Sequence, residues 1–150
     1  MDVVSRLSQL LEANEIVFSY EPTNEHPVAE LHNELGFGIL EGFPLKVTLT
    51  KGRQMFTTYI VQKHDLEKPD DIAVLFHIIF DALSIMGEDF DTWLSQIESK
   101  HPINDRVKAH ALFDIMAAET RALIEFLGME TFIEFTVLLV PSITEYAHAA

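Results

Sequence analysis

Residues 72–86 read IAVLFHIIFDALSIM, and twelve of these fifteen residues are apolar. The three exceptions, His77, Asp81 and Ser84, follow one another at spacings of four and three residues. That spacing places all three on one side of an α-helix, because positions i, i+3 and i+4 share a face. A helix lying on a surface would carry far more polar residues. We therefore expect a central helix that is buried on most sides and carries one narrow polar stripe.

The clearest strand pattern precedes this helix. Residues 45–50 (LKVTLT) alternate apolar and polar side chains, which is the period of a strand with one buried face. Lys51 and Gly52 provide a tight turn, and residues 53–62 (RQMFTTYIVQ) return as a second strand. We expect the resulting hairpin, residues 45–62, to be the centre of a small antiparallel sheet.

The other elements follow from the same periodicities. Before the hairpin, a helix is expected at 2–14, a short strand at 16–20, and either a helix or a strand at 28–35. After it, helices are expected at 70–86, 89–97 and 103–127. For residues 130–140 a helix is favoured over a strand, with Pro141 separating it from a tail, 142–150. The fold class predicted is α+β, a small antiparallel sheet packed against a helical half, in one domain over 1–150.

Composition narrows the class of protein. The chain has no cysteine, which excludes disulfides, thiol catalysis and cysteine metal sites. Its first residues carry acids where a secretion signal carries bases, and apolar runs stay below the ~18 residues that span a bilayer. The sequence has no nucleophile elbow and no phosphate-binding glycine loop. We expect a cytoplasmic, non-catalytic protein without a cofactor.

Charge is the strongest global signal. The formal net charge is −14, which repels nucleic acids and anionic membranes and favours basic partners. Seven acids flank the central helix in two groups, namely Asp65, Glu67, Asp70 and Asp71 before it, and Glu88, Asp89 and Asp91 after it. Two such groups at a fixed distance could imitate phosphates and contact a basic surface. The plainer interpretation is solubility and helix capping.

A frame of residues over about 45–135 resembles a family of small, mostly uncharacterised acidic proteins of bacteriophages and prophages. It consists of KVTL (46–49), Gly52, Arg53, Met55, Tyr59, Pro69, Asp71, Leu75, Asp81, Ala82, Phe90, Trp93, Asp105, Ala109, Phe113, Phe126, Leu127, Gly128 and Phe132. The resemblance implies a small phage accessory protein in a bacterial cytoplasm. Many such proteins inhibit a host defence machine by binding it. The family contributes no catalytic residues.

Histidines and acids suggest two metal sites. His77 and Asp81 lie four residues apart, and His110 with Asp114 repeats that spacing. If their helices packed with these faces together, the four side chains could hold one metal ion. The alternative is a local hydrogen bond or ion pair within each helix. A second cluster, His26, Glu30 and His32, offers three ligands in seven residues, or simply a polar surface loop.

Residues 130–143 hold more apolar side chains than one face of a helix can bury. They belong either to the core or to a homodimer interface. Three functions follow, in this order. The first is an acidic phage or prophage protein that inhibits a bacterial nucleic-acid-handling defence complex, of the anti-CRISPR or anti-restriction type. The second is a small metal-binding domain or enzyme that uses the His/Asp pairs. The third is an assembly protein that dimerises through 130–143.

Overall fold

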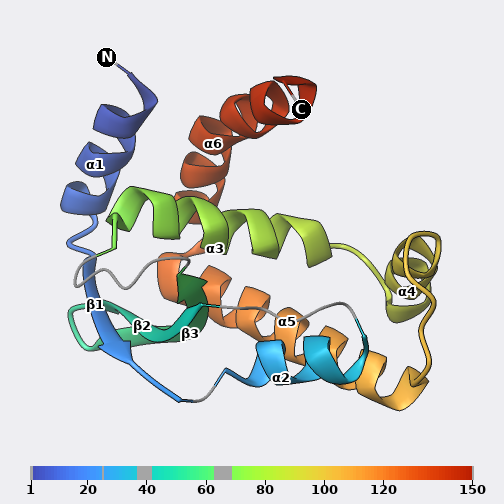
Figure 1. Ribbon diagram of the computed structural model, residues 1–150. Helices are drawn as coiled ribbons and strands as arrows, with labels where there is room; N and C mark the ends of the chain where they lie inside the picture. Colours follow the sequence, from blue (N-terminus) through green and yellow to red (C-terminus); the bar gives the residue numbers. More distant parts are fainter. Residues whose placement is uncertain (1, 25, 37–41, 63–68, 150) are drawn as a thin grey trace.

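The computed structural model describes residues 2–24, 26–36, 42–62 and 69–149, with side chains up to residue 139. Six helices and three strands make up this part of the chain (Figure 1). In chain order they are α1 (Val3–Ala13), β1 (Val17–Pro22), α2 (Pro27–Glu34), β2 (Phe43–Lys51), β3 (Gln54–Gln62), α3 (Asp71–Ile85), α4 (Phe90–Glu98), α5 (Arg106–Leu127) and α6 (Met129–Ala149). The α+β class is confirmed.

The three strands form one antiparallel sheet in the order β1-β2-β3. Val47 in the middle strand pairs with Tyr20 of β1 and with Thr58 of β3. The predicted alternation holds, because one face of the hairpin is buried while the other stays half-exposed. The buried face consists of Leu45, Val47, Leu49, Phe56, Thr58 and Ile60. Thr58 is therefore a polar side chain among apolar neighbours.

The central helix α3 has the predicted two-sided character. Leu75 and Ile79 are fully buried, whereas His77, Asp81 and Ser84 form an exposed stripe. Asp70 begins the helix as its N-cap, where a carboxylate oxygen accepts a hydrogen bond from the Ile72 N–H. The stripe prediction is confirmed, and it fixes which faces of α3 contact the sheet and the other helices.

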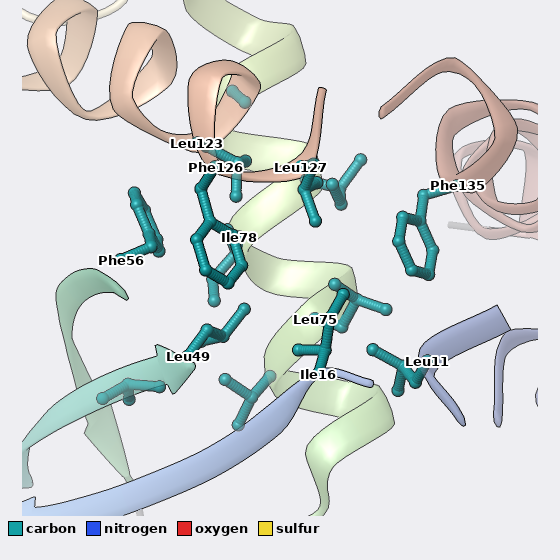
Figure 2. Packing of buried hydrophobic residues seen from close by; sticks show 14 of the residues in the cluster. Leu11, Ile16, Leu49, Phe56, Leu75, Ile78, Leu123, Phe126, Leu127 and Phe135 are labelled. Atoms are coloured by element: carbon teal, nitrogen blue, oxygen red, sulfur yellow. The ribbon is translucent and has the colours of Figure 1, made fainter. Parts of the chain in front are cut away.

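Most of the apolar core lies between the sheet and α3, α5 and α6. Figure 2 shows Phe56 and Leu49 of the sheet, Leu75 and Ile78 of α3, Phe126 of α5 and Phe135 of α6 converging from different elements. Residues from α1 complete this cluster, which we call the main core. The main core therefore joins segments from both ends of the chain.

A second apolar cluster lies at the other end of α3 and α5. It contains Leu35, Ile85, Trp93, Leu94, Ala109 and Leu112, and so joins the ends of α2 and α3 to α4 and the first half of α5. We call it the distal core. Because α3 and α5 run through both cores, they position everything that lies between them (Figure 1).

Two sequence-based expectations need comment. The segment predicted as helix or strand at 28–35 is the helix α2, capped by His26 with Pro27 in its first turn. The separation of a tail at Pro141 is wrong, because α6 continues to Ala149. Proline fixes φ near the helical value and removes one backbone donor, so it weakens a helix locally without obliging the chain to leave it. The preferred helix at 130–140 is confirmed as part of α6.

Candidate functional site

The first acidic group lies at the N-terminus of α3. Asp65 and Glu67 lie outside the described residues. Asp70 is an exposed N-cap, so its charge remains available on the surface. Asp71 is different, because its Oδ1 accepts a 2.5 Å hydrogen bond from the hydroxyl of half-buried Tyr20. Of this group, Asp70 is the described residue best placed to contact a partner.

The second acidic group lies beyond the C-terminus of α3. Asp89 is the exposed N-cap of α4 and accepts a 2.7 Å hydrogen bond from the Thr92 N–H. That bond lowers the pKa of the Asp89 carboxyl, because it stabilises the ionised form. Asp91 pairs with Arg106 at 2.6 Å, and Glu88 is half-buried between the two helices. The group keeps its negative charge, with one member compensated by Arg106.

Fifteen residues of α3 separate the two groups, a length of about 22 Å at ~1.5 Å per residue. Within the described residues, the Lys or Arg ion pairs are Arg106 with Asp91 and Lys108 with Glu34. The chain has 24 Asp and Glu against 10 Lys and Arg. Most of its acids therefore lack a basic partner, and the surface potential is strongly negative.

The two His/Asp pairs form separate local contacts. His77 Nε2 lies 3.2 Å from Asp81 Oδ2 on α3, and His110 Nδ1 lies 2.9 Å from Asp114 Oδ2 on α5. The His110 ring packs on Phe90, with ring centroids 4.5 Å apart, in the distal part of the fold. The expected four-ligand convergence is wrong, because the faces that carry the pairs do not meet. Among the described residues no group of three metal-ligating side chains is placed to hold a metal ion.

A cavity of about 390 Å³ lies where the main core and the distal core meet. Its apolar wall takes Phe56, Ile60, Ile78, Ala82 and Leu123 from the main core side, and Val28 and Met116 from the distal side. Its polar lining consists of His26, His32, Thr58, Tyr59, His77, Asp81, Glu119 and Thr120. The fold thus brings His26 and His32 to the same cavity as the His77–Asp81 pair, although the sequence places them in separate clusters.

His26 is buried because it caps α2 toward the cavity. Its Nδ1 accepts a 3.0 Å hydrogen bond from the Ala29 N–H, so the neutral ring carries its proton on Nε2. Its ring also packs near Tyr59, with centroids 6.1 Å apart. Burial lowers the pKa of His26, and burial likewise lowers the pKa of His32. Glu30, the third member of the predicted cluster, is exposed in the first turn of α2.

Two carboxylates reach the cavity from different helices. Glu119 of α5 accepts a 3.4 Å hydrogen bond from the Thr58 hydroxyl across to β3. Burial raises the pKa of Glu119, and the negative charge of Asp81 raises it further. Burial also raises the pKa of Asp81, while the neighbouring His77 opposes that shift. The two carboxyls therefore repel each other in a partly dehydrated space.

Sequence analysis missed Glu119, Thr58 and Thr120. A signal for Thr58 existed, because alternation places it on the buried face between Phe56 and Ile60. Glu119 and Thr120 carry no comparable signal, since isolated polar residues are ordinary in a long helix. Only the packing of α5 against β3 shows that Glu119 meets Thr58.

The apolar segment at 130–143 divides between core and surface. Phe132, Phe135 and Leu139 are buried, whereas Ile133 and Val137 are 51% and 65% exposed. The exposed pair lines a groove of about 520 Å³ between α1 and α6, whose other members are Arg6, Gln9, Leu10, Ala13, Glu134 and Leu138. Both interpretations of the segment therefore describe part of it.

Fold and site together define an acidic α+β protein with charged ends on its central helix and a mixed polar and apolar cavity. None of the helices in the described part of the chain combines the length and apolar character needed to cross a membrane. The chain matches no family model, no curated protein and no solved structure.

Proposed function

We propose that the chain is a non-catalytic binding protein whose partner is a basic bacterial protein or nucleoprotein complex. The contact is made by the carboxylates at the two ends of α3, described here for Asp70, Glu88 and Asp89. The observation that carries the proposal is their placement on either side of a helix about 22 Å long, in a chain of net charge −14. Rigid charges at a fixed separation favour a partner with matching positive charges.

The structure of the two ends supports such a contact. Asp70 and Asp89 both use one carboxylate oxygen to cap a helix, so each side chain is held in place while it stays exposed. Holding a charged group in advance lowers the entropy lost on binding. The surrounding negative field also increases the rate of encounter with a basic surface.

The finer proposal concerns the class of partner. The frame over about 45–135 resembles small acidic phage and prophage proteins, many of which bind host defence machines. A nucleic-acid-handling defence complex, of the CRISPR or restriction type, has the basic channel that two separated acidic groups would fit. The protein would then act in the cytoplasm of the bacterial host, as an inhibitor that occupies a phosphate-binding surface.

The test removes charge without disturbing the caps. Asn is as good an N-cap as Asp, so the triple variant Asp70→Asn, Glu88→Gln, Asp89→Asn keeps the helix starts and removes three charges. The full-length chain is immobilised and exposed to lysate from a bacterium with several defence systems, at ~0.1 M and ~0.5 M salt. The expected result is one stoichiometric complex, retained at low salt and lost at high salt. For the triple variant we expect affinity at least about tenfold weaker.

A matched control separates the site from the overall charge. Glu125, Glu130 and Glu134 are exposed on α5 and α6, away from the ends of α3, so changing them to Gln removes the same charge elsewhere. This control variant should retain the partner. Equal loss in both variants would mean that net charge alone drives the interaction. Recovery of no partner at low salt would contradict the proposal.

One observation favours the assembly alternative. Ile133 and Val137 expose apolar side chains beside the α1–α6 groove, where a second copy could cover them. Under that alternative, sedimentation would show a dimer that resists ~0.5 M salt and dissociates in an Ile133→Glu, Val137→Glu variant. A salt-resistant monomer would exclude it.

A further inference from the structure

We propose that the cavity between the main core and the distal core is a binding site for a small organic ammonium ion with an apolar body. Asp81 and Glu119 bind the ammonium group, and the apolar wall surrounds the rest of the molecule. This inference is independent of the acidic-surface function, because none of its residues belongs to the two ends of α3.

The size and lining of the cavity fit a small molecule. Its volume of about 390 Å³ lies within the range of roughly 300–1,000 Å³ typical of ligand pockets. Most such pockets combine a mainly apolar wall with a few convergent polar groups. Here Phe56, Ile78 and Leu123 represent the wall, while Asp81 and Glu119 reach the same space from α3 and α5.

Charge determines the class of ligand. Among the described residues that line the cavity there is no Lys or Arg, so its two carboxylates have no permanent positive partner there. His77 contacts Asp81, but Glu119 is held by the neutral hydroxyl of Thr58. A cation placed between them would relieve their mutual repulsion and gain charge-assisted hydrogen bonds. A neutral or anionic ligand would gain neither.

The same geometry argues against a bare metal ion. Among the described residues no three ligating side chains converge, and a divalent ion needs at least that many. An ammonium ion needs only a few hydrogen-bond acceptors, together with apolar contact for its carbon skeleton. Glu119, Asp81 and the apolar wall supply both.

The probe is 2-phenylethylammonium, compared with its neutral analogue 2-phenylethanol and its anionic analogue 3-phenylpropionate. Each is titrated into the full-length ¹⁵N-labelled chain at pH 7.5, and amide shifts of Thr58, Ala82 and Glu119 report on the cavity. We expect saturable binding of the ammonium compound and binding about tenfold or more weaker for both analogues. Equal affinity for the alcohol would overturn the proposal, as would the absence of saturable shifts at these amides.

Glu119→Gln has a matched control on the same helix. Glu125→Gln removes the same charge from an exposed position outside the cavity. We expect Glu119→Gln to weaken ammonium binding about tenfold and Glu125→Gln to leave it within about twofold. Equal weakening in both would assign the binding to the general negative field and reject the site. If Glu119→Gln does not fold, the comparison of the three compounds on the unchanged chain still decides.

Ammonium affinity should fall between pH 7.5 and pH 5.5. The titratable groups facing the two carboxyls are His26 and His32 of α2, Tyr59 of β3 and His77 of α3. On acidification the histidines gain positive charge, and the carboxyls, whose pKa burial raises, begin to lose their negative charge. Tyr59 stays neutral over this range. Both changes oppose a cation, so an affinity that rises on acidification would contradict the site.

Discussion

The hydroxyl of Tyr20 donates a hydrogen bond to Oδ1 of Asp71 at 2.5 Å, which joins β1 to the first residue of α3 across 51 positions of sequence. Both residues are half-buried. The contact removes Asp71 from the set of free surface acids and fixes the start of α3 against the sheet. Asp71 is therefore a structural residue, although the sequence places it in an acidic cluster.

Tyr20→Phe should lower the free energy of unfolding by about 1–2 kcal/mol, because it leaves the Asp71 carboxylate without its donor. Urea denaturation at pH 7 measures the loss. Burial and the bond to Asp71 raise the pKa of Tyr20 above 10.0. The advantage of Tyr over Phe is therefore complete below about pH 10 and decreases as the pH rises above it. An advantage that stays constant up to pH 10.5 would contradict this assignment.

His26 should make the fold sensitive to mild acid. Its pKa is lowered by burial, so the unfolded chain takes up this proton at higher pH than the folded chain. The stability it contributes is complete above its ordinary pKa of 6.5 and is lost as the pH falls below that value. Protonation also removes the Nδ1 acceptor that caps α2. His32, whose pKa is also lowered by burial, acts in the same direction.

His26→Asn isolates this effect, because Asn retains an N-cap acceptor and does not titrate. We expect the loss of unfolding free energy between pH 7.5 and pH 5.5 to be smaller in the variant than in the unchanged chain. Asp81 and Glu119, with raised pKa values, give an opposite contribution, since folding favours their protonated forms. They are identical in both proteins, so the comparison removes them. Identical pH profiles would show that His26 is not the acid-sensitive group.

Phe135 and Val137 provide a matched pair on α6. Phe135 is fully buried in the main core, and Phe135→Ala should cost about 3–5 kcal/mol through lost burial and the cavity left behind. Val137 is 65% exposed, so Val137→Ala should change stability by about 0.5 kcal/mol or less. Thermal or urea unfolding distinguishes the two. Similar costs would mean that α6 packs with a different face inward.

Gly128 joins α5 to α6 with φ 83° and ψ 145°, a conformation that L side chains rarely adopt. A Cβ at this position would meet nothing within 4 Å, so the cost of a side chain comes from the backbone alone. Gly128→Ala should therefore lower stability by about 1–3 kcal/mol without a change in the core. Urea unfolding gives the cost, and near-ultraviolet circular dichroism checks the aromatic packing. An unaffected stability would contradict the conformation of this junction.

Local patterns were sufficient for most of the secondary structure. The alternation of 45–50, the turn at Gly52 and the polar stripe of His77, Asp81 and Ser84 each depend on neighbours within a few residues. A strand or helix with one buried face must repeat its apolar residues at the period of that element. The position of α6 beyond Pro141 was not predicted, because proline is tolerated or excluded according to context that the sequence pattern does not contain.

The sequence by itself determined the α+β class, the hairpin, the central helix and the excess of negative charge, since these follow from short-range periodicity and composition. Only the tertiary structure decided which polar residues meet. It placed His26 and Glu119 at one cavity, separated His110 from His77, and turned Asp71 toward Tyr20. Such meetings depend on how α2, α3 and α5 pack against the sheet. That packing is determined by the summed fit of many apolar side chains, which no local pattern encodes.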